Sequence, residues 1–294
     1  MPQDNFAMHI GHVALRSPTP GLTATHLTES LGLSQTTSDD GQILMSVAGQ
    51  HHGVQLIPGE APGLDHIGLR VEDWRALDGL RDRVVAAGAK ILSESTDEPG
   101  IEHVLRFVGP AGVAFEVYTT APRDLTASLI PADGARKLGH VTLFSESAKE
   151  LLEFLTTALN FRESDSFGSR VTWLRCDADH HGIAVSLAPQ DRLHHYAFEL
   201  QDWSAIGRYC DRLSGLGKRL IWGPGRHGPG LNLYTYTPDP DGAIVEAYAD
   251  LMRIDDEANY RPVRWDKVDG ALNLWGPESP EFFRDLGVPI LSPH

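Results

Sequence analysis

The sequence predicts an α+β fold of two tandem domains, in which paired βαβββ modules form a curved, barrel-like mixed sheet with helices outside. Three observations lead to this prediction. The chain has 294 residues, enough for two ordinary domains. Each half alternates helical and strand patterns in a mixed order, which favours helices packed on a sheet. The second half also repeats landmarks of the first at a nearly constant spacing.

Composition narrows the functional classes. The net charge of −15 opposes binding to polyanions, so we expect no nucleic-acid partner. No apolar run approaches the roughly 18–20 residues that span a bilayer, and residues 1–6 do not resemble a secretory signal, so we expect no membrane partner. Two cysteines, Cys176 and Cys210, form no disulfide framework and predict a cytoplasmic location. Fourteen histidines, several of them adjacent, point to metal chemistry.

The first half opens with an alternating apolar strand. Its second helix places Leu77, Leu80, Val84 and Val85 at helical spacing, with Asp73 as the expected N-cap. The expected strands cover residues 9–15, 43–47, 53–57, 64–71, 103–107 and 113–118, and the expected helices cover 23–31 and 74–87.

The second half follows the same plan. It begins with a strand at 137–143 that restates the Gly-His-Val motif of the opening strand, and it contains a turn at 239–242. The expected strands cover residues 137–143, 171–176, 193–200, 231–236 and 244–248, and the expected helix covers 148–159. A glycine-rich loop, Gly223-Pro-Gly-Arg-His-Gly-Pro-Gly230, precedes the last two strands.

Four pairs of residues define the repeat, at offsets of 128 to 130 residues. The pairs are His12 with His140, His51 with His180, His66 with His195, and Glu116 with Glu246. We therefore expect a duplicated module, with an N-terminal domain at 1–125, a linker near 120–135, and a C-terminal domain at 136–294. The tail of the second domain, from residue 250 onward, is expected to cover it, with Trp265 and Trp275 as packing anchors.

Glu246 is an unusual residue for its strand, because Ile244, Val245 and Ala247 surround it. A buried carboxylate needs a partner, and a metal cation is one such partner. His140 and His195 stand in strands of alternating pattern, and two imidazoles with one carboxylate on one face make a facial triad suited to Fe(II) and dioxygen. The alternative for each histidine is an ordinary half-buried strand residue bonded to a backbone carbonyl.

The second half resembles the catalytic domain of the type I extradiol ring-cleaving dioxygenases, in the vicinal oxygen chelate superfamily. A loop histidine followed by tyrosine after nine residues and glutamate after nineteen is the most specific match. The matching segments are Leu138-Gly-His-Val141, Trp173-Leu-Arg-Cys-Asp-Ala-Asp-His-His-Gly182, His194-His-Tyr-Ala-Phe-Glu199, Gly223-Pro-Gly-Arg-His-Gly228, Tyr236-Thr-Pro-Asp-Pro-Asp-Gly242 and Val245-Glu-Ala-Tyr248.

This resemblance implies a catalytic second domain that binds Fe(II), with Mn(II) as the alternative, through His140, His195 and Glu246. It also implies a catecholic substrate, dioxygen as co-substrate, and a homo-oligomer. His180 corresponds to the family's acid–base histidine, although a register in which His181 points inward stays open. His227 and Tyr236 correspond to groups that hydrogen-bond the substrate or an oxygenated intermediate, and Tyr236 could instead be a plain sheet aromatic.

The first half retains His12, His66 and Glu116 but lacks the glycine-rich loop, and Arg106 falls where the second half has Tyr236. We therefore expect a non-catalytic remnant of duplication. Apolar residues in and after the loop favour a neutral or hydrophobic catechol over one that carries a carboxylate; these are Trp222, Leu231, Leu233 and Tyr234. The rival hypotheses are a metal-free ligand-binding protein and a glyoxalase-type enzyme of the same superfamily.

Overall fold

The computed structural model describes residues 8–292 apart from 38–40, 48–49, 97, 99 and 121–132. Residues 1–6, on which the expectation about a secretory signal rests, lie outside the described residues. So do most of the expected linker and the domain boundary at residue 125, and those expectations stay predictions.

The first half forms an eight-stranded sheet, with strand order β2-β3-β4-β1-β5-β8-β7-β6. Its elements are β1 (Met8–Ser17), α1 (Pro20–Leu31), β2 (Ser34–Thr37), β3 (Ile43–Ser46), β4 (Val54–Pro58), β5 (Gly63–Val71), α2 (Arg75–Ala86), β6 (Lys90–Ser93), β7 (Ile101–Val108) and β8 (Ala114–Thr120). The chain therefore runs through two βαβββ modules, whose first strands, β1 and β5, pair at the centre of the sheet.

The second half repeats this arrangement, with strand order β14-β15-β16-β13-β9-β12-β11-β10 and β17 added beside β10. Its elements are β9 (Lys137–Ser145), α3 (Ala148–Thr157), β10 (Arg162–Phe167), β11 (Val171–Arg175), β12 (Ile183–Leu187), β13 (Arg192–Glu199), α4 (Trp203–Gly215), β14 (Trp222–Arg226), β15 (Leu233–Pro238), β16 (Ile244–Ala249), β17 (Val263–Arg264) and β18 (Val288–Pro289). Parallel pairs, such as β13 with β16, mix with antiparallel ones.

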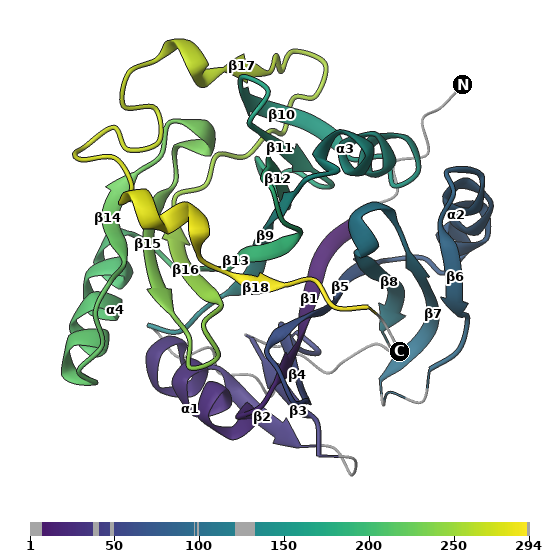
Figure 1. The fold of residues 1–294 in the computed structure, drawn as a ribbon, viewed down its shortest axis with the longest axis horizontal. Coiled ribbons are helices and arrows are strands. Elements are labelled where there is room, and N and C mark those ends of the chain that lie inside the picture. Colours follow the sequence, from purple (N-terminus) through teal and green to yellow (C-terminus); the bar gives the residue numbers. More distant parts are fainter. Residues whose placement is uncertain are drawn as a thin grey trace.

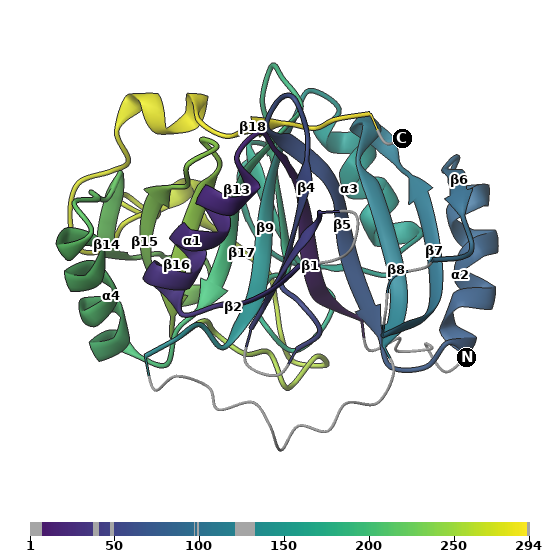
Figure 2. The ribbon, with the colours of Figure 1, turned by 90° about the horizontal axis from the view of Figure 1, so that it is seen from below.

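The predicted α+β fold with mixed sheets is confirmed (Figure 1). The two halves lie side by side, with α2 at one end of the molecule and α4 at the other (Figures 1 and 2). The N-cap of α2 is Trp74 and not the expected Asp73, although Asp73 accepts a hydrogen bond from the Arg75 N–H at 3.0 Å. Strands β2, β6, β10, β12 and β14 were not expected from the sequence, because they are short or polar, or lie in segments that the pattern assigned to loops.

One continuous hydrophobic core joins the two halves. It includes Leu15 and Ile67 from the first sheet, and Leu143 and Phe198 from the second. Polar contacts also cross between the halves: His9 Nδ1 lies 2.8 Å from Asp177, and Arg212 donates to the Ser30 carbonyl at 3.1 Å. Among the described residues, no helix is long and apolar enough to cross a membrane.

The C-terminal tail covers the second sheet and then crosses to the first half (Figure 1). Trp265 is half-buried and donates a 2.7 Å hydrogen bond to Asp165, so it anchors the tail as expected. Trp275, the other expected packing anchor, packs edge-on against Trp203 but remains 53% exposed, so its packing is at the surface. At the end of the tail, the Leu291 N–H donates to the Leu64 carbonyl in β5 at 2.9 Å.

Candidate metal centre

Three adjacent strands of the second sheet, β9, β13 and β16, each present one candidate ligand. Ala197 on β13 pairs with His140 on one side and with Glu246 on the other, and His195 lies two residues before Ala197. Residues that pair across strands, or lie two apart along a strand, share one face of a sheet. The three side chains therefore converge, and the small Ala197 methyl group between them leaves space.

The donor atoms of this trio face one another. Nε2 of His140 lies 2.9 Å from Oε2 of Glu246, and Nε2 of His195 lies 3.2 Å from the same oxygen. All three side chains are buried. Two bonds of about 2.1 Å at right angles on a metal ion separate their donors by about 3 Å. The spacing and chemistry of these donors therefore fit a divalent ion held on one face.

The hydrogen bonds of His194 select the tautomer of His195 that can bind a metal. Nε2 of His194 faces the Phe283 carbonyl at 2.9 Å, so it carries a proton and donates it. Its Nδ1 is then an acceptor for Nδ1–H of His195 at 2.7 Å. A neutral His195 with its proton on Nδ1 keeps a lone pair on Nε2, directed at the centre. Burial lowers the pKa of His195 and favours that neutral form.

Glu246 is held by a second contact. Asn232 donates to its Oε1 at 3.2 Å, which leaves Oε2 for the two histidines. Burial alone would raise the pKa of this carboxyl, but His140 and His195 outweigh that effect and hold it well below its usual range. The Glu246 carboxylate is thus ionised and pre-positioned. By contrast, Nδ1 of His140 is buried and has no hydrogen-bond partner among the described residues.

The glycine-rich loop brings His227 beside this centre. Nδ1 of His227 faces the Leu272 carbonyl at 2.6 Å and so carries the proton, which makes Nε2 the acceptor for the Tyr236 hydroxyl at 2.9 Å. Burial lowers the pKa of His227 to about 4, so it is neutral near pH 7. Tyr236 pairs with Glu246 across β15 and β16, and both it and His227 line a cavity above the centre.

The structure resolves the register that the sequence left open between His180 and His181. His181 lines the cavity, and its ring centroid lies 4.4 Å from that of His140. His180 is fully buried behind it, with its Nδ1 3.0 Å from Nδ1 of His181. Nε2 of His180 lies 3.0 Å from Asp165, at an angle too oblique for a strong hydrogen bond.

This arrangement orders the protons of the pair. The Asp165 carboxylate favours a proton on Nε2 of His180, so Nδ1 of His180 accepts from Nδ1–H of His181. His181 is then left with a bare Nε2. Burial, followed by the neighbouring His140 and His180, lowers the pKa of His181, so its resting form is a neutral imidazole.

The cavity next to the trio has a volume of about 330 Å³ and is lined largely by aromatic and apolar side chains. These include Phe144, Phe167, Val171, Trp173, Trp222 and Phe283. Four apolar residues were expected from the sequence to favour a neutral catechol, but only Trp222 of these lines the cavity. The prediction is wrong for the other three: Leu231, Leu233 and Tyr234.

The charged side chains at the cavity do not come from the arginine of the glycine-rich loop. Arg226 does not line it, because its guanidinium donates to the Leu231 carbonyl and to Asp250. Besides Glu246 of the trio, two arginines and two glutamates line it, and the formal charges of these four cancel: Arg170, Arg284, Glu278 and Glu281.

Sequence reasoning missed several supporting residues of the site. Asn232 holds Glu246, His194 holds His195, and Asp165 holds His180. Two further residues at the site, Leu272 and Phe283, come from the tail. The adjacent pair His194-His195 was a visible signal, since neighbouring histidines can set each other's tautomer. No local pattern marks the tail residues, because they reach the site only through tertiary packing.

A family model and several known proteins are similar to this chain. Residues 137–247, which span β9 to β16, match the model of the Glyoxalase/Bleomycin resistance protein/Dioxygenase superfamily. The resemblance to type I extradiol ring-cleaving dioxygenases is confirmed by relatives that span most of the chain. Metapyrocatechase 2 of Cupriavidus necator is 28% identical over 229 residues, 70% of each chain.

Two further relatives cover nearly the full length. Manganese-dependent 2,3-dihydroxybiphenyl 1,2-dioxygenase of Geobacillus genomosp. 3 is 26% identical over 91% of this chain and 93% of its own. The crystal structure of a Mn(II)-bound glyoxalase from Novosphingobium aromaticivorans superposes with a TM-score of 0.84 at 28% identity. It covers 97% of this chain and 94% of that one.

Proposed function

We propose that this protein is an extradiol dioxygenase, which inserts both atoms of dioxygen into a catechol and opens the aromatic ring beside the diol. The observation that carries the proposal is the convergence of His140, His195 and Glu246 beside a cavity that His181, His227 and Tyr236 also border. Relatives named for catechol and dihydroxybiphenyl cleavage support it.

His140, His195 and Glu246 would hold a divalent metal ion, Fe(II) or Mn(II). When bound, that ion would supply adjacent open positions for the two catechol oxygens and for dioxygen. A relative named as manganese-dependent supports Mn(II) as much as Fe(II). The choice between the two metals stays open to measurement.

His181 is the group best situated to move protons on the cavity side of the trio. Its pKa lies below the usual value, so the resting ring accepts a proton at Nε2 when a catechol hydroxyl ionises. The charge that develops on the ring is then stabilised through Nδ1–H, His180 and the Asp165 carboxylate. This proposal moves the acid–base role from His180 to its neighbour and gives His180 a positioning role.

Tyr236 and His227 would act as one hydrogen-bonded unit. The Tyr236 hydroxyl donates to Nε2 of His227, whose orientation is set by the Leu272 carbonyl. Burial, followed by the nearby Glu246, raises the pKa of Tyr236, so it stays protonated. Its hydroxyl oxygen can accept a hydrogen bond from a substrate hydroxyl, and its proton can be redirected to an oxyanion in the cavity.

The cavity walls favour a catechol with an apolar substituent. Aromatic side chains supply stacking surface for a second ring or an alkyl group, and the four charged side chains outside the trio balance one another. We therefore keep the prediction of catechol, alkylcatechols or aryl catechols such as dihydroxybiphenyl. Turnover of carboxylated catechols alone would contradict it.

The test is anaerobic reconstitution with Fe(II) or Mn(II), followed by oxygen and a panel of catechol, 3-methylcatechol, 2,3-dihydroxybiphenyl and protocatechuate. We expect oxygen uptake coupled to a yellow ring-cleavage product with the first three. The His195→Ala variant should lose both bound metal and activity. Bound metal with neither oxygen uptake nor colour for any catechol would refute the proposal.

A glyoxalase-type activity is the second candidate, because one structural relative is titled a glyoxalase. Isomerisation of a glutathione hemithioacetal by the metal-loaded protein, without oxygen uptake on catechols, would favour it. A metal-free binding role is the third, and it would require that the purified protein retain no divalent metal. The trio of buried donors argues against that role, since such groups are costly without a cation.

Three other sequence predictions remain proposals. A cytoplasmic location is supported by two free thiols, Cys176 and Cys210. A homo-oligomer and a non-catalytic N-terminal domain at 1–125, beside a catalytic domain at 136–294, rest on the family resemblance. Size-exclusion chromatography with light scattering tests the oligomer.

A further inference from the structure

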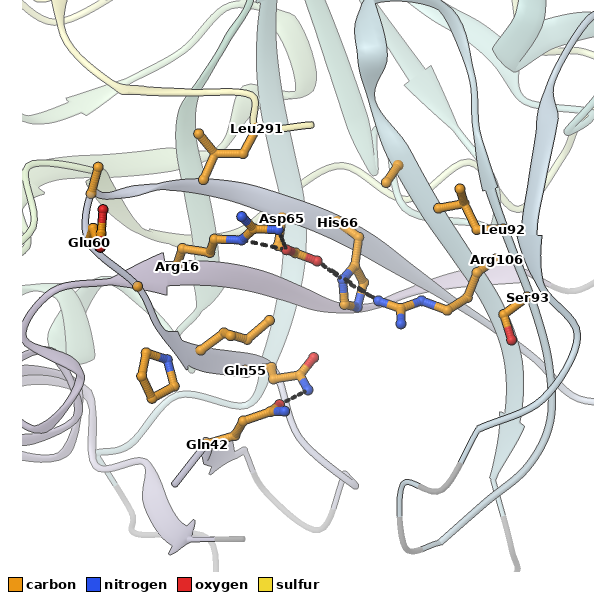
Figure 3. Close-up of a pocket in the computed structure, with 15 residues that line it drawn as sticks. Arg16, Gln42, Gln55, Glu60, Asp65, His66, Leu92, Ser93, Arg106 and Leu291 are labelled. Atoms are coloured by element: carbon orange, nitrogen blue, oxygen red, sulfur yellow. Dashed lines mark hydrogen bonds and ion pairs between the residues drawn. The ribbon is translucent and has the colours of Figure 1, made fainter. Parts of the chain in front are cut away.

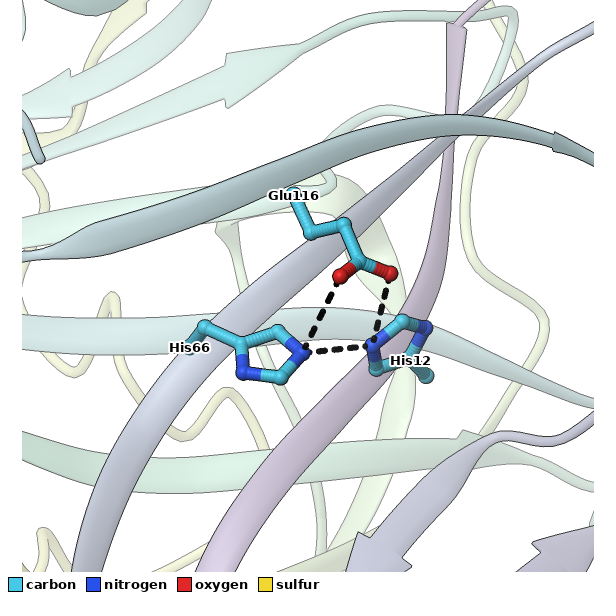
Figure 4. A group of neighbouring side chains, drawn as sticks. All are labelled: His12, His66 and Glu116. Carbon is cyan, nitrogen blue, oxygen red and sulfur yellow. Dashed lines mark hydrogen bonds and ion pairs between the residues drawn. The ribbon is translucent and has the colours of Figure 1, made fainter. Parts of the chain in front are cut away.

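The first half places a second trio in the register of the first. Gly68 on β5 pairs with His12 on β1 and with Glu116 on β8, as Ala197 pairs with His140 and Glu246. His66 lies two residues before Gly68, so all three side chains share one face (Figure 4). A Cβ at Gly68 would overlap with the His12 ring in its present position.

The donor atoms of this second trio also face one another. Nε2 of His12 lies 3.0 Å from Nε2 of His66, and each is 4.0 Å from one oxygen of Glu116. All three side chains are buried. Oε1 of Glu116 has no hydrogen-bond partner in the described part of the chain, although it faces His12. Arg106 contacts the other oxygen, Oε2, so a metal cation beside Oε1 would satisfy an atom whose burial is otherwise costly.

Supporting contacts orient two of these ligands. Oδ1 of Asp65 lies 2.8 Å from Nδ1 of His66 and favours a proton there, which leaves Nε2 free to bind a metal. Arg16 in turn holds Asp65 by an ion pair of 2.7 Å (Figure 3). The Tyr118 hydroxyl lies 3.2 Å from Nδ1 of His12 and orients that ring.

Arg106 both positions and opposes such a site. Its Nε lies 3.1 Å from Oε2 of Glu116, as Asn232 holds one oxygen of Glu246. Its terminal nitrogen also lies 3.0 Å from Nδ1 of His66, where it competes with Asp65 for the same ring atom (Figure 3). The Arg106 side chain is 35% exposed, so it has room to withdraw from His66.

One member of the trio, His66, lies on the wall of a cavity. A cavity of about 650 Å³ in the first half is lined by His66, Asp65 and Arg106, and closed on one side by Leu291 of the tail (Figure 3). Ligand identity, supporting hydrogen bonds and access are the features that a metal site requires.

We propose that His12, His66 and Glu116 form a second site for a divalent first-row transition metal ion, weaker than the site in the second half. Two imidazole nitrogens and one carboxylate oxygen suit Mn(II), Fe(II) or Zn(II). The site is weaker for two reasons. Glu116 must move closer to both histidines, and the guanidinium of Arg106 repels the incoming cation.

The experiment is a Mn(II) titration of tag-free, metal-stripped full-length protein, in which electron paramagnetic resonance counts the free ion. Wild type should bind two ions per chain in two phases. His140→Ala should retain one ion, at the weaker phase, and His140→Ala with Glu116→Gln should bind none. Circular dichroism and a thermal melt establish that each variant is folded. One ion per chain in wild type, with none in folded His140→Ala, would overturn the proposal.

Two further variants locate the second ion. Arg106→Met should tighten the weaker phase by at least about tenfold, because a unit positive charge leaves the vicinity of the ion. Glu98→Gln is the matched control, since Glu98 lies in a neighbouring group with His51 and His52. It should leave two ions bound. Loss of the weaker phase in Glu98→Gln but not in Glu116→Gln, or no effect of Arg106→Met, would refute the assignment.

Discussion

Tyr236 lies directly opposite Glu246 across strands β15 and β16, and its hydroxyl donates to His227 2.9 Å away. In the first half Arg106 occupies the same position opposite Glu116, as the sequence predicted. The two halves thus share one ligand geometry but differ in the group beside the carboxylate. The neutral hydroxyl of Tyr236 suits an enzyme site, whereas the positive charge of Arg106 opposes the binding of a metal ion.

Replacement of Tyr236 by Phe tests that neutral donor. The variant keeps the ring packing but removes the hydroxyl that links His227 to the cavity, so we expect turnover to fall about 10²–10³-fold with metal content unchanged. Tyr234→Phe is the matched control, because its ring stacks on His227 while its buried hydroxyl has no hydrogen-bond partner among the described residues. Equal losses in both variants would contradict a specific role for the Tyr236 hydroxyl.

The two adjacent histidines should differ in their contribution to turnover. His181→Ala removes the imidazole that faces the cavity, so we predict a loss of about 10²-fold or more in kcat with metal retained. His180→Ala removes only the ring behind it and should cost less. Steady-state oxygen uptake and metal analysis of both variants check this. A larger loss in His180→Ala would return the acid–base role to that residue.

Gly139 precedes the candidate ligand His140 at a position where the structure leaves no space for a larger residue. A Cβ at this position would overlap with the Tyr248 hydroxyl, so Gly139→Ala should destabilise the protein by about 1–3 kcal/mol. The double variant with Tyr248→Phe should recover only part of that loss, since the nearest atom, the hydroxyl oxygen, is gone while the ring carbon Cζ would still lie 2.7 Å from the new Cβ. Urea unfolding of the single and double variants measures the coupling, and additive effects would show that the overlap is not the cause.

His26 on α1 should make stability sensitive to acid. Burial, and then Lys218, lowers its pKa to about 4, whereas the unfolded value is about 6.5. The unfolded state therefore binds a proton that the folded state does not as pH falls from about 6.5 toward 4. The contribution of neutral His26 to the free energy of unfolding is fully present above that window, and about 1.4 kcal/mol of this free energy is lost by pH 5.5.

Urea unfolding at pH 8 and pH 5.5 measures this effect. His26→Gln should lose less stability between the two pH values than wild type, by about that amount. The exposed His103 supplies the control, because His103→Gln should keep the wild-type pH dependence. An unchanged difference in His26→Gln would exclude His26 as the source.

Much of the fold could be predicted because its signals are local. A pattern of a few residues is enough to predict several elements: the alternating strands β1 and β9, the helices α1 and α3, and the turn at Asp239. The missed strands lack that signal: β10 is largely polar, and β14 runs through the glycine-rich loop. They become strands because a neighbour supplies hydrogen bonds, which is a tertiary effect.

The sequence by itself determined the duplication, the residue types of both trios, and the loop that distinguishes the second half, because repeated motifs survive as patterns along the chain. Only the tertiary structure decided which of His180 and His181 faces the cavity, and that Asn232 holds Glu246. It also placed Asp65 and Arg106 beside the same nitrogen of His66, Nδ1, for which they compete. These choices depend on strand register and side-chain direction between segments far apart in sequence, and no local pattern encodes them.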